Sequence, residues 1–369
     1  MKEMKRDETQ RRYAFIKVLG ITVLALLMLV NMADAAPFAY VTNENVINFK
    51  PGEGTVSVID IAANTVVATL PVGTGPEGIA VNPDGTKVYV ANNFGNTVSV
   101  IDATTKTVTA TVNVGASPWG VAVTPDGTKV YVANRNSNTV SIIDATTNKV
   151  TSTVNVDCPY GVAVSPDGTK VYVTNININT TSVIDTATNT ITNTIKVGKD
   201  PCGVTVTPDG KKVYVVNWGS NNVSVIDTAT NTVTATVNVG DNPNLIAFTP
   251  DGTRGYVTNH VSFNVSVIDI ATNTVIATVE GNLPTGVAVT PDGTKVYVVN
   301  ELKGTVSVID TATNTITNTI KVGENPCGVA IGNFMGNAQD TTPKTPAGFN
   351  ILILAAMSIL YIWKKSTRK

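Results

Sequence analysis

Residues that could carry acid–base, nucleophilic or metal chemistry are few in this chain. Its 369 residues include one histidine, His260, and three cysteines. No His-rich metal set, Ser-His-Asp trio, Cys-x-x-Cys-His haem motif or glycine-rich phosphate loop occurs. This inventory argues against an enzyme and predicts no metal site and no cofactor. Calcium stays open, because a Ca²⁺ site built only from carboxylates on a turn would leave no signature here.

Aromatic side chains with charged neighbours are the better candidates for a functional site. Such rings suit sugars or protein loops, because they offer a large contact surface at low entropic cost. The alternative is that some of them fill the mouth of a channel. The candidate binding residues are Phe94, Trp119, Arg135, Tyr160, Trp218, His260, Phe263, Glu77 and Glu301.

An internal repeat of 41 or 42 residues must position these side chains. The aspartate of a P-D-G turn recurs at Asp84, Asp126, Asp167, Asp209, Asp251 and Asp292. The aspartate that ends V-S-V-I-D recurs at Asp60, Asp102, Asp144, Asp185, Asp227, Asp269 and Asp310. The chain therefore holds seven units of one repeat.

Each unit reads as four short strands. In residues 120–156 the runs GVAV, KVYVAN, TVSIID and KVTSTVNV are rich in β-branched residues and are bounded by Gly, Pro, Asn or Asp. The P-D-G sequence suits a hairpin turn, and the aspartate of V-I-D suits an Asx turn. A four-stranded unit of about 40 residues cannot cover its own apolar faces, so the units must stack. We expect an all-β, seven-bladed β-propeller of four-stranded antiparallel blades.

The repeat begins and ends within a blade. Residues 38–43 match a second strand, residues 327–331 match a first strand, and Phe334 stands where the next turn aspartate is due. We expect the last blade to be shared between the N- and C-terminal strands, which removes exposed sheet edges. The six other blades are expected near residues 77–114, 119–156, 160–197, 202–239, 244–280 and 285–322.

Variation among the copies points to one face of the ring. The one–two and three–four hairpin loops are nearly invariant, whereas the two–three loops and the blade crossovers differ from copy to copy. Function is expected on the variable face, which carries the candidate residues. Residues 44–54, an insertion in the shared blade, are a further candidate contact.

The two ends of the chain are apolar and lie outside the repeat. Residues 1–36 have a charged start, an apolar stretch and an A-x-A site, which favours a secretory signal cut after Ala35, or an N-terminal anchor. The repeat domain is expected over residues 37–332, followed by a polar Thr/Pro linker over 333–347. Residues 348–369 are expected to form a C-terminal transmembrane helix with a basic tail. The prediction is thus flanking apolar helices at both termini and a ring exported to the cell surface.

Charge limits the partners. Residues 36–346 carry 16 Lys and Arg against 23 Asp and Glu, so this acidic ring disfavours nucleic acid. The turn cations are interpreted as a solvated rim neutralised by the turn aspartates: Lys87, Lys129, Lys170, Lys211, Arg254 and Lys295.

Cysteines and asparagines add two further predictions. Cys202 and Cys327 share one repeat position on opposite sides of the ring and offer no partner ligands. Cys158 and Cys202 enter neighbouring blades, so a bridge between them stays open; otherwise all three are small apolar fillers. Three N-x-[ST] sequons are candidate glycan acceptors: Asn179, Asn222 and Asn264.

The block Y-V-[AT]-N followed by V-S-V-I-D-T-A-T-N-T-V, repeated seven times between residues 38 and 331, resembles the YVTN repeat family. The resemblance implies a seven-bladed propeller and similarity to archaeal surface-layer proteins. The first hypothesis is a non-enzymatic, membrane-anchored scaffold at the cell surface that binds an envelope protein or glycan. The alternatives are a lactonase-type hydrolase with a carboxylate or Ca²⁺ site in the channel, and a periplasmic-type ligand- or nucleic-acid-binding propeller.

Overall fold

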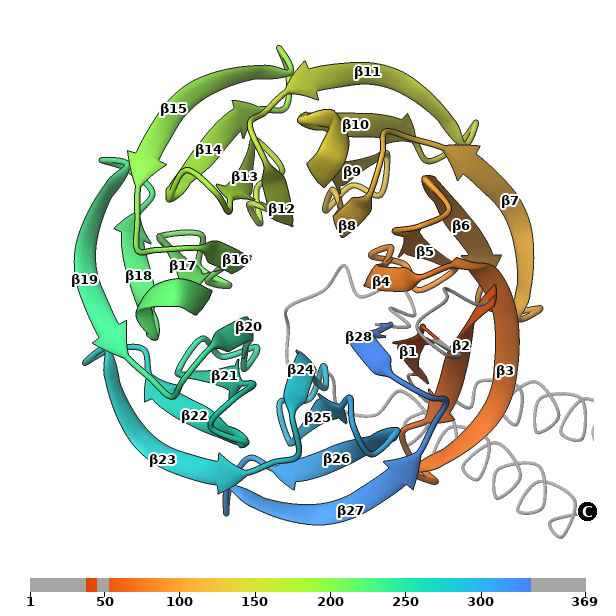
Figure 1. Cartoon of the computed structure of the whole chain (residues 1–369). Helices are drawn as coiled ribbons and strands as arrows, with labels where there is room; N and C mark the ends of the chain where they lie inside the picture. Colours follow the sequence, from red (N-terminus) through yellow and green to blue (C-terminus); the bar gives the residue numbers. More distant parts are fainter. Residues whose placement is uncertain (1–37, 45–52, 333–369) are drawn as a thin grey trace, which may run out of the picture. The chain divides into compact units, whose positions relative to one another are not determined.

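Seven four-stranded antiparallel sheets form a ring in the computed structural model, which describes residues 38–44 and 53–332 (Figure 1). The predicted all-β, seven-bladed propeller is confirmed. In each blade the first strand lies nearest the central channel and the fourth forms the rim.

The strands share one order in every blade, from the channel outwards. Blades one to three are β4 (Pro76–Val81), β5 (Lys87–Asn92), β6 (Thr97–Asp102) and β7 (Thr107–Asn113); β8 (Pro118–Val123), β9 (Lys129–Asn134), β10 (Thr139–Asp144) and β11 (Lys149–Asn155); and β12 (Pro159–Val164), β13 (Lys170–Asn175), β14 (Thr180–Asp185) and β15 (Thr190–Lys196). Blades four to six are β16 (Pro201–Val206), β17 (Lys212–Asn217), β18 (Asn222–Asp227) and β19 (Thr232–Asn238); β20 (Pro243–Phe248), β21 (Arg254–Asn259), β22 (Asn264–Asp269) and β23 (Thr274–Glu280); and β24 (Pro284–Val289), β25 (Lys295–Asn300), β26 (Thr305–Asp310) and β27 (Thr315–Lys321). Blade seven is β28 (Pro326–Ile331), β1 (Phe38–Asn43), β2 (Glu53–Asp60) and β3 (Thr65–Thr74).

Blade seven closes the ring as the sequence predicts. Strand β28 pairs antiparallel with β1, placing Ala39 opposite Ile331 and Val41 opposite Val329. The first and last described strands are therefore neighbours in one sheet.

The turns use the residues expected of them. Gly127 has a φ of 70°, which only glycine adopts freely. The Asp126 carboxylate accepts the Thr128 N–H at 3.0 Å. At the other hairpin, Asp144 accepts the N–H of Thr147 at 2.7 Å. Each turn is thus closed by its own aspartate.

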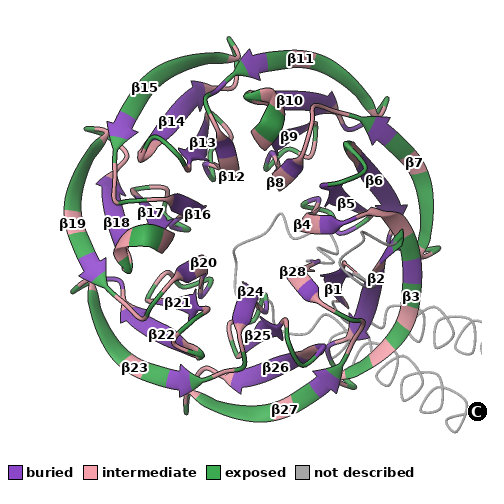
Figure 2. Cartoon of the chain, in the orientation of Figure 1, coloured by how far each residue is buried: buried purple, intermediate pink, exposed green. Residues whose placement is uncertain are grey.

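The core consists of apolar layers between neighbouring blades. One layer joins Tyr40 and Val58 of blade seven to Val88 and Ile101 of blade one. The second-strand tyrosines are fully buried in every blade, whereas the rim strands are largely exposed (Figure 2). A blade alone would leave these faces in water, so the ring is the unit that folds.

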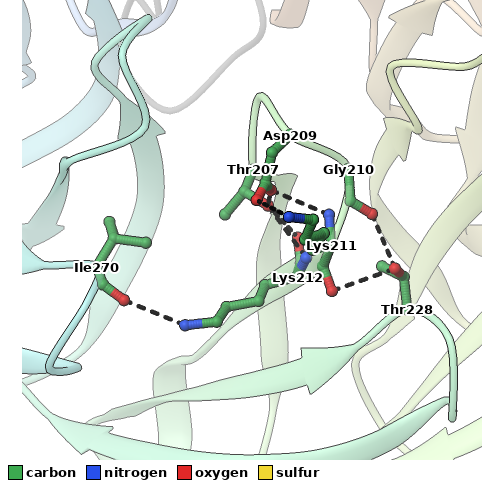
Figure 3. Close-up of polar contacts among 7 residues, drawn as sticks. All are labelled: Thr207, Asp209, Gly210, Lys211, Lys212, Thr228 and Ile270. Atoms are coloured by element: carbon green, nitrogen blue, oxygen red, sulfur yellow. Dashed lines mark hydrogen bonds and ion pairs between the residues drawn. The ribbon is translucent and has the colours of Figure 1, made fainter.

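The turn cations bind the next blade rather than forming only a solvated rim. Lys212 Nζ donates to the Ile270 carbonyl at 3.1 Å (Figure 3). Lys87, Lys129 and Lys170 donate in the same way to carbonyls of their next blades. Lys211, assigned to this position from the sequence, instead faces Asp209 at 3.8 Å and is exposed. The sequence alignment was one residue out here, because K-K replaces T-K in blade four.

The prediction of flanking apolar helices at both termini is wrong. Residues 38–44 and 53–332 contain two three-residue 3₁₀ turns, η1 (Arg135–Ser137) and η2 (Trp218–Ser220), and no α-helix. That prediction rested on apolar runs shorter than the 18 consecutive residues that indicate a membrane-spanning helix, since Lys17 interrupts the first run and the second, residues 347–363, has 17. Within the described ranges no helix is both long and apolar enough to cross a membrane. The segments 1–36, 333–347 and 348–369 lie outside the described residues.

Candidate functional site

Two positions of the repeat face the same end of the central channel. The first is the middle residue of the P-x-G sequence on the inner strands, which is Glu77, Trp119, Tyr160, Cys202, Asn244, Thr285 and Cys327 in blades one to seven. The second is the residue that follows the second strand, which is Asn93, Arg135, Ile176, Trp218, His260, Glu301 and Glu44 in the same order. Pro precedes the first position in every blade and Gly follows it in all but blade five, while Asn precedes the second position in every blade. The two sets therefore differ between blades while these neighbours hardly change.

Close packing of the inner strands brings the first set together. A Cβ atom placed on Gly78 would lie 2.1 Å from the Trp119 carbonyl oxygen, and one on Gly161 would lie 2.2 Å from that of Cys202. Only glycine allows backbones to approach this closely. The seven middle residues therefore form a narrow circle.

Backbone hydrogen bonds hold the second set beside the first. The amides of Trp218 and His260 donate to the carbonyls of Asp200 and Asn242 in the preceding crossovers, at 3.0 Å in each case. The two–three loops and the crossovers therefore lie on one face of the ring, as the sequence predicts.

Both sets line a cavity of about 300 Å³. Eleven of its lining residues come from the two repeat positions: Glu77, Trp119, Tyr160, Cys202, Asn244, Thr285, Cys327, Glu44, Trp218, His260 and Glu301. Leu245, which replaces the P-x-G glycine in blade five, lines it too. Six of the nine candidate binding residues thus line the cavity.

Aromatic rings form one wall of this cavity. Trp119 stacks on Tyr160 with ring centroids 4.5 Å apart, and Trp218 lies 5.5 Å from His260. The Arg135 guanidinium lies over the ring of Tyr160, 5.7 Å from its centroid. Because Trp119 and Tyr160 already stack on each other, a ligand would contact their outer surfaces and edges.

The cavity is also lined by acidic side chains. His260 Nε2 lies 3.0 Å from Glu301 Oε2. Glu77 is hydrogen-bonded to Glu44 and to the Cys327 thiol, which also lies 3.4 Å from the Asn325 carbonyl oxygen. Burial, and then the charge of Glu44, raises the pKa of Glu77 well above its ordinary value. Burial likewise raises the pKa of Tyr160, with a further contribution from Glu77.

The predicted site residues separate into two groups. Glu77, Trp119, Tyr160, Trp218, His260 and Glu301 line the cavity, and Arg135 reaches it through its contact with Tyr160. Phe94 and Phe263 do not line it; their exposed fractions are 54% and 46%. These two rings lie farther along the two–three loops and face solvent.

Sequence reasoning missed Glu44 and Cys327 as neighbours of Glu77. The signal was available: comparing the copies position by position shows that Glu44 is the counterpart of His260, and Cys327 that of Trp119. Contact between Glu44 and Glu77 depends on ring closure, which no local pattern contains.

The remaining predicted sites are the cysteines and the sequon asparagines. Cys158, Cys202 and Cys327 are all free thiols. The sequon asparagines are partly exposed at the start of their third strands or the loop before, and each side-chain oxygen accepts a hydrogen bond: Asn179, Asn222 and Asn264.

Comparison with known proteins identifies the repeat and the fold. The model of a family described as YNCE-like β-propeller matches residues 36–125, 80–180, 123–212 and 167–258, which together span more than half of the chain. No curated protein matches the chain.

Solved structures share the architecture. Hydrazine synthase from Kuenenia stuttgartiensis is 25% identical with a TM-score of 0.65, covering 72% of this chain and 96% of that one. A functionally unknown protein from Desulfotomaculum acetoxidans DSM 771 is 19% identical with a TM-score of 0.71, covering 80% and 99%. A candidate 6-phosphogluconolactonase from Bacteroides fragilis NCTC 9343 is 17% identical with a TM-score of 0.67, covering 82% and 99%. The last two similarities carry the fold alone.

Proposed function

We propose that this chain, which belongs to the YNCE-like β-propeller family, is a non-enzymatic scaffold that binds an envelope protein or glycan at the mouth of its channel. The ring acts at the extracellular face of the envelope, in the manner of a surface-layer protein, with residues 1–36 as its secretory signal. The family fixes the fold, so the proposal depends on the chemistry of the cavity.

One observation carries the proposal. One cavity is lined by four rings from the consecutive blades two to five, those of Trp119, Tyr160, Trp218 and His260, and Glu301 is hydrogen-bonded to the histidine. Rings of this kind bury a large area and lose little side-chain entropy, which suits recognition of sugar faces and protein loops. The inner strands fix the backbones of Trp119 and Tyr160, and bonds to the crossovers fix those of Trp218 and His260, so the wall is formed before the ligand arrives.

The test is a binding experiment with a matched control. The full chain and the variant Trp119→Ala, Tyr160→Ala, Trp218→Ala are titrated with purified envelope polysaccharide and, separately, with solubilised envelope proteins. The triple variant should lose binding while its far-ultraviolet circular dichroism stays that of a β-propeller. Phe94→Ala and Phe263→Ala remove exposed aromatic rings outside the cavity and should bind like the parent chain. Binding that survives the triple variant would place recognition elsewhere.

A specific observation favours a second candidate, a lactonase-type hydrolase. Three carboxyl groups, those of Glu44, Glu77 and Glu301, line the same cavity. A carboxyl whose pKa is raised by burial is suited to general acid catalysis. The candidate lactonase from Bacteroides fragilis has the same fold at 17% identity.

Lactone hydrolysis distinguishes the two functions. The chain is incubated with five- and six-membered sugar lactones, with and without Ca²⁺, and compared with Glu77→Gln. The scaffold proposal expects equal, background rates from both proteins. Turnover that Glu77→Gln abolishes would replace the scaffold with the hydrolase.

A further inference from the structure

Three metal-binding side chains meet where the ring closes. Glu44 follows β1, Glu77 lies on β4 of the adjoining blade, and Cys327 lies on β28. One donor atom from each, two carboxylate oxygens and Sγ, lies within 4.8 Å of the others. Hydrogen bonds hold the backbone at these positions. Glu44 N donates to Asn325 O at 3.1 Å, the Thr42 hydroxyl donates to Glu77 O at 2.8 Å, and the amide of Gly328, next to Cys327, donates to the Thr42 hydroxyl at 2.8 Å.

Within the part of the chain that the structure describes, these three groups have no cationic partner. Among the described residues neither carboxyl group forms an ion pair with Lys, Arg or His, and their side-chain partners are each other and the Cys327 thiol. All three are only partly exposed, and the solvent that reaches them is that of the cavity. Burial raises the pKa of Glu77 and that of Cys327 well above their ordinary values. Crowded acids in such surroundings keep their protons unless a cation replaces them.

The donor set selects the class of cation. Ca²⁺ and Mg²⁺ prefer shells made entirely of oxygen, whereas a thiolate favours ions of borderline softness such as Zn²⁺ and Co²⁺. Donor atoms around tetrahedral zinc lie roughly 3.4–3.8 Å apart, so inward movement of about 1 Å or less would complete the three contacts. The cavity leaves room for water as a fourth ligand.

We propose that Glu44, Glu77 and Cys327 form a binding site for one zinc-like divalent ion that latches the two ends of the propeller together. The ion joins strands β1 and β28 of the closing blade to blade one, so its binding stabilises the closed ring. It requires no ligand on the aromatic wall, and it is independent of the scaffold function.

The chain contains two matched controls. Cys202 occupies the same repeat position in blade four and lines the same cavity. Its thiol contacts the Asn244 carbonyl at 3.1 Å, as that of Cys327 contacts the Asn325 carbonyl at 3.4 Å, but no pair of carboxyl groups lies beside it. Glu301 is the third carboxylate of the cavity and is bonded to His260. Neither belongs to the three-residue cluster.

The experiment measures binding of Zn²⁺ to the metal-stripped, tag-free full chain by calorimetry, with thermal unfolding in parallel. One ion should bind per chain and raise Tm, and Co²⁺ should give the near-ultraviolet absorption of a cobalt–thiolate bond. Cys327→Ser and Glu77→Gln should each weaken Zn²⁺ binding by about tenfold or more. Cys202→Ser should leave it unchanged, and Glu301→Gln, which removes a nearby charge but no ligand, should weaken it less than either ligand variant. Near-ultraviolet circular dichroism without metal verifies that each variant has folded.

Two outcomes would overturn the proposal. One is the absence of stoichiometric Zn²⁺ binding to the parent chain. The other is binding that Cys327→Ser retains in full, or that Cys202→Ser or Glu301→Gln abolishes, because the ion would then lie elsewhere in the cavity.

Discussion

Substituting two equivalent tyrosines by phenylalanine should have opposite effects on stability. Tyr297 and Tyr89 occupy the same place on the second strands of blades six and one, and both are fully buried. The Tyr297 hydroxyl donates to Asn64 Oδ1 at 2.8 Å across the blade boundary. The Tyr89 hydroxyl is buried and has no hydrogen-bond partner among the described residues.

The magnitudes follow from this difference. Phenylalanine keeps the ring and its packing, so the change isolates the hydroxyl group. In Tyr297→Phe one hydrogen bond is lost, which costs about 0.5–1.5 kcal/mol of unfolding free energy. In Tyr89→Phe a buried hydroxyl without a partner is removed, which should be neutral or stabilise by up to about 1 kcal/mol. The two variants should therefore differ by roughly 0.5–2.5 kcal/mol.

Equilibrium unfolding in urea measures both variants against the parent chain. The midpoint should fall for Tyr297→Phe and stay level or rise for Tyr89→Phe, with equal slopes. Tyr214, which donates to Asn273, and Tyr172, whose hydroxyl is buried without a partner, provide a second pair. Equal losses from Tyr89→Phe and Tyr297→Phe would refute the assignment of the difference to hydrogen bonding.

Two further predictions concern the backbone and the turns. Gly161→Ala should lower the unfolding free energy by about 1–3 kcal/mol in urea titrations, because its Cβ would meet the Cys202 carbonyl at 2.2 Å; Gly95→Ala, whose Cβ would have no contact nearer than 3.4 Å, is the tolerated control. Hydrogen bonds from Thr124 and the Thr128 amide lower the pKa of Asp126, and most turn aspartates are held similarly. Because these pKa values lie below the unfolded value of about 3.9, this stability is present above that pH and is lost as the pH falls through the folded values. Urea midpoints between about pH 6 and pH 2 should show this loss, and Asp126→Asn should reduce it; a midpoint independent of pH would contradict it.

Most of the fold could be predicted because short local sequence patterns determine it, and these patterns recur in all seven repeats. The P-D-G turns, the V-I-D turns and the β-branched strands each determine structure within a few residues, and repetition fixes the number of blades. Closure was predictable because the Phe38 and Cys327 segments are complementary parts of one unit. The terminal helices were predicted from short apolar runs with charged flanks, and that prediction failed, since the described residues contain no α-helix.

The site was predictable only in part. Variation among copies located the correct face, and ring size selected Trp119, Tyr160 and Trp218. Neither Glu44 nor Cys327 stands out by residue type. Their importance comes from contact with Glu77, and that contact depends on strands far apart in sequence. Position-by-position comparison of the repeats would have included them, because chemistry here is encoded by place in the unit rather than by residue type.

The shared blade also constrains how the molecule is made. Val41 of β1 pairs with Val329 of β28, so 27 strands are synthesised before the one that closes the ring. Until then the edge of β1 is unpaired, and the apolar faces at both ends of the growing arc are exposed to other chains in the cell. Joining residues so distant is slow compared with hairpin formation. The interval between the emergence of β1 and that of β28 is therefore the period of greatest aggregation risk, and shielding the nascent arc would matter more than any later rescue.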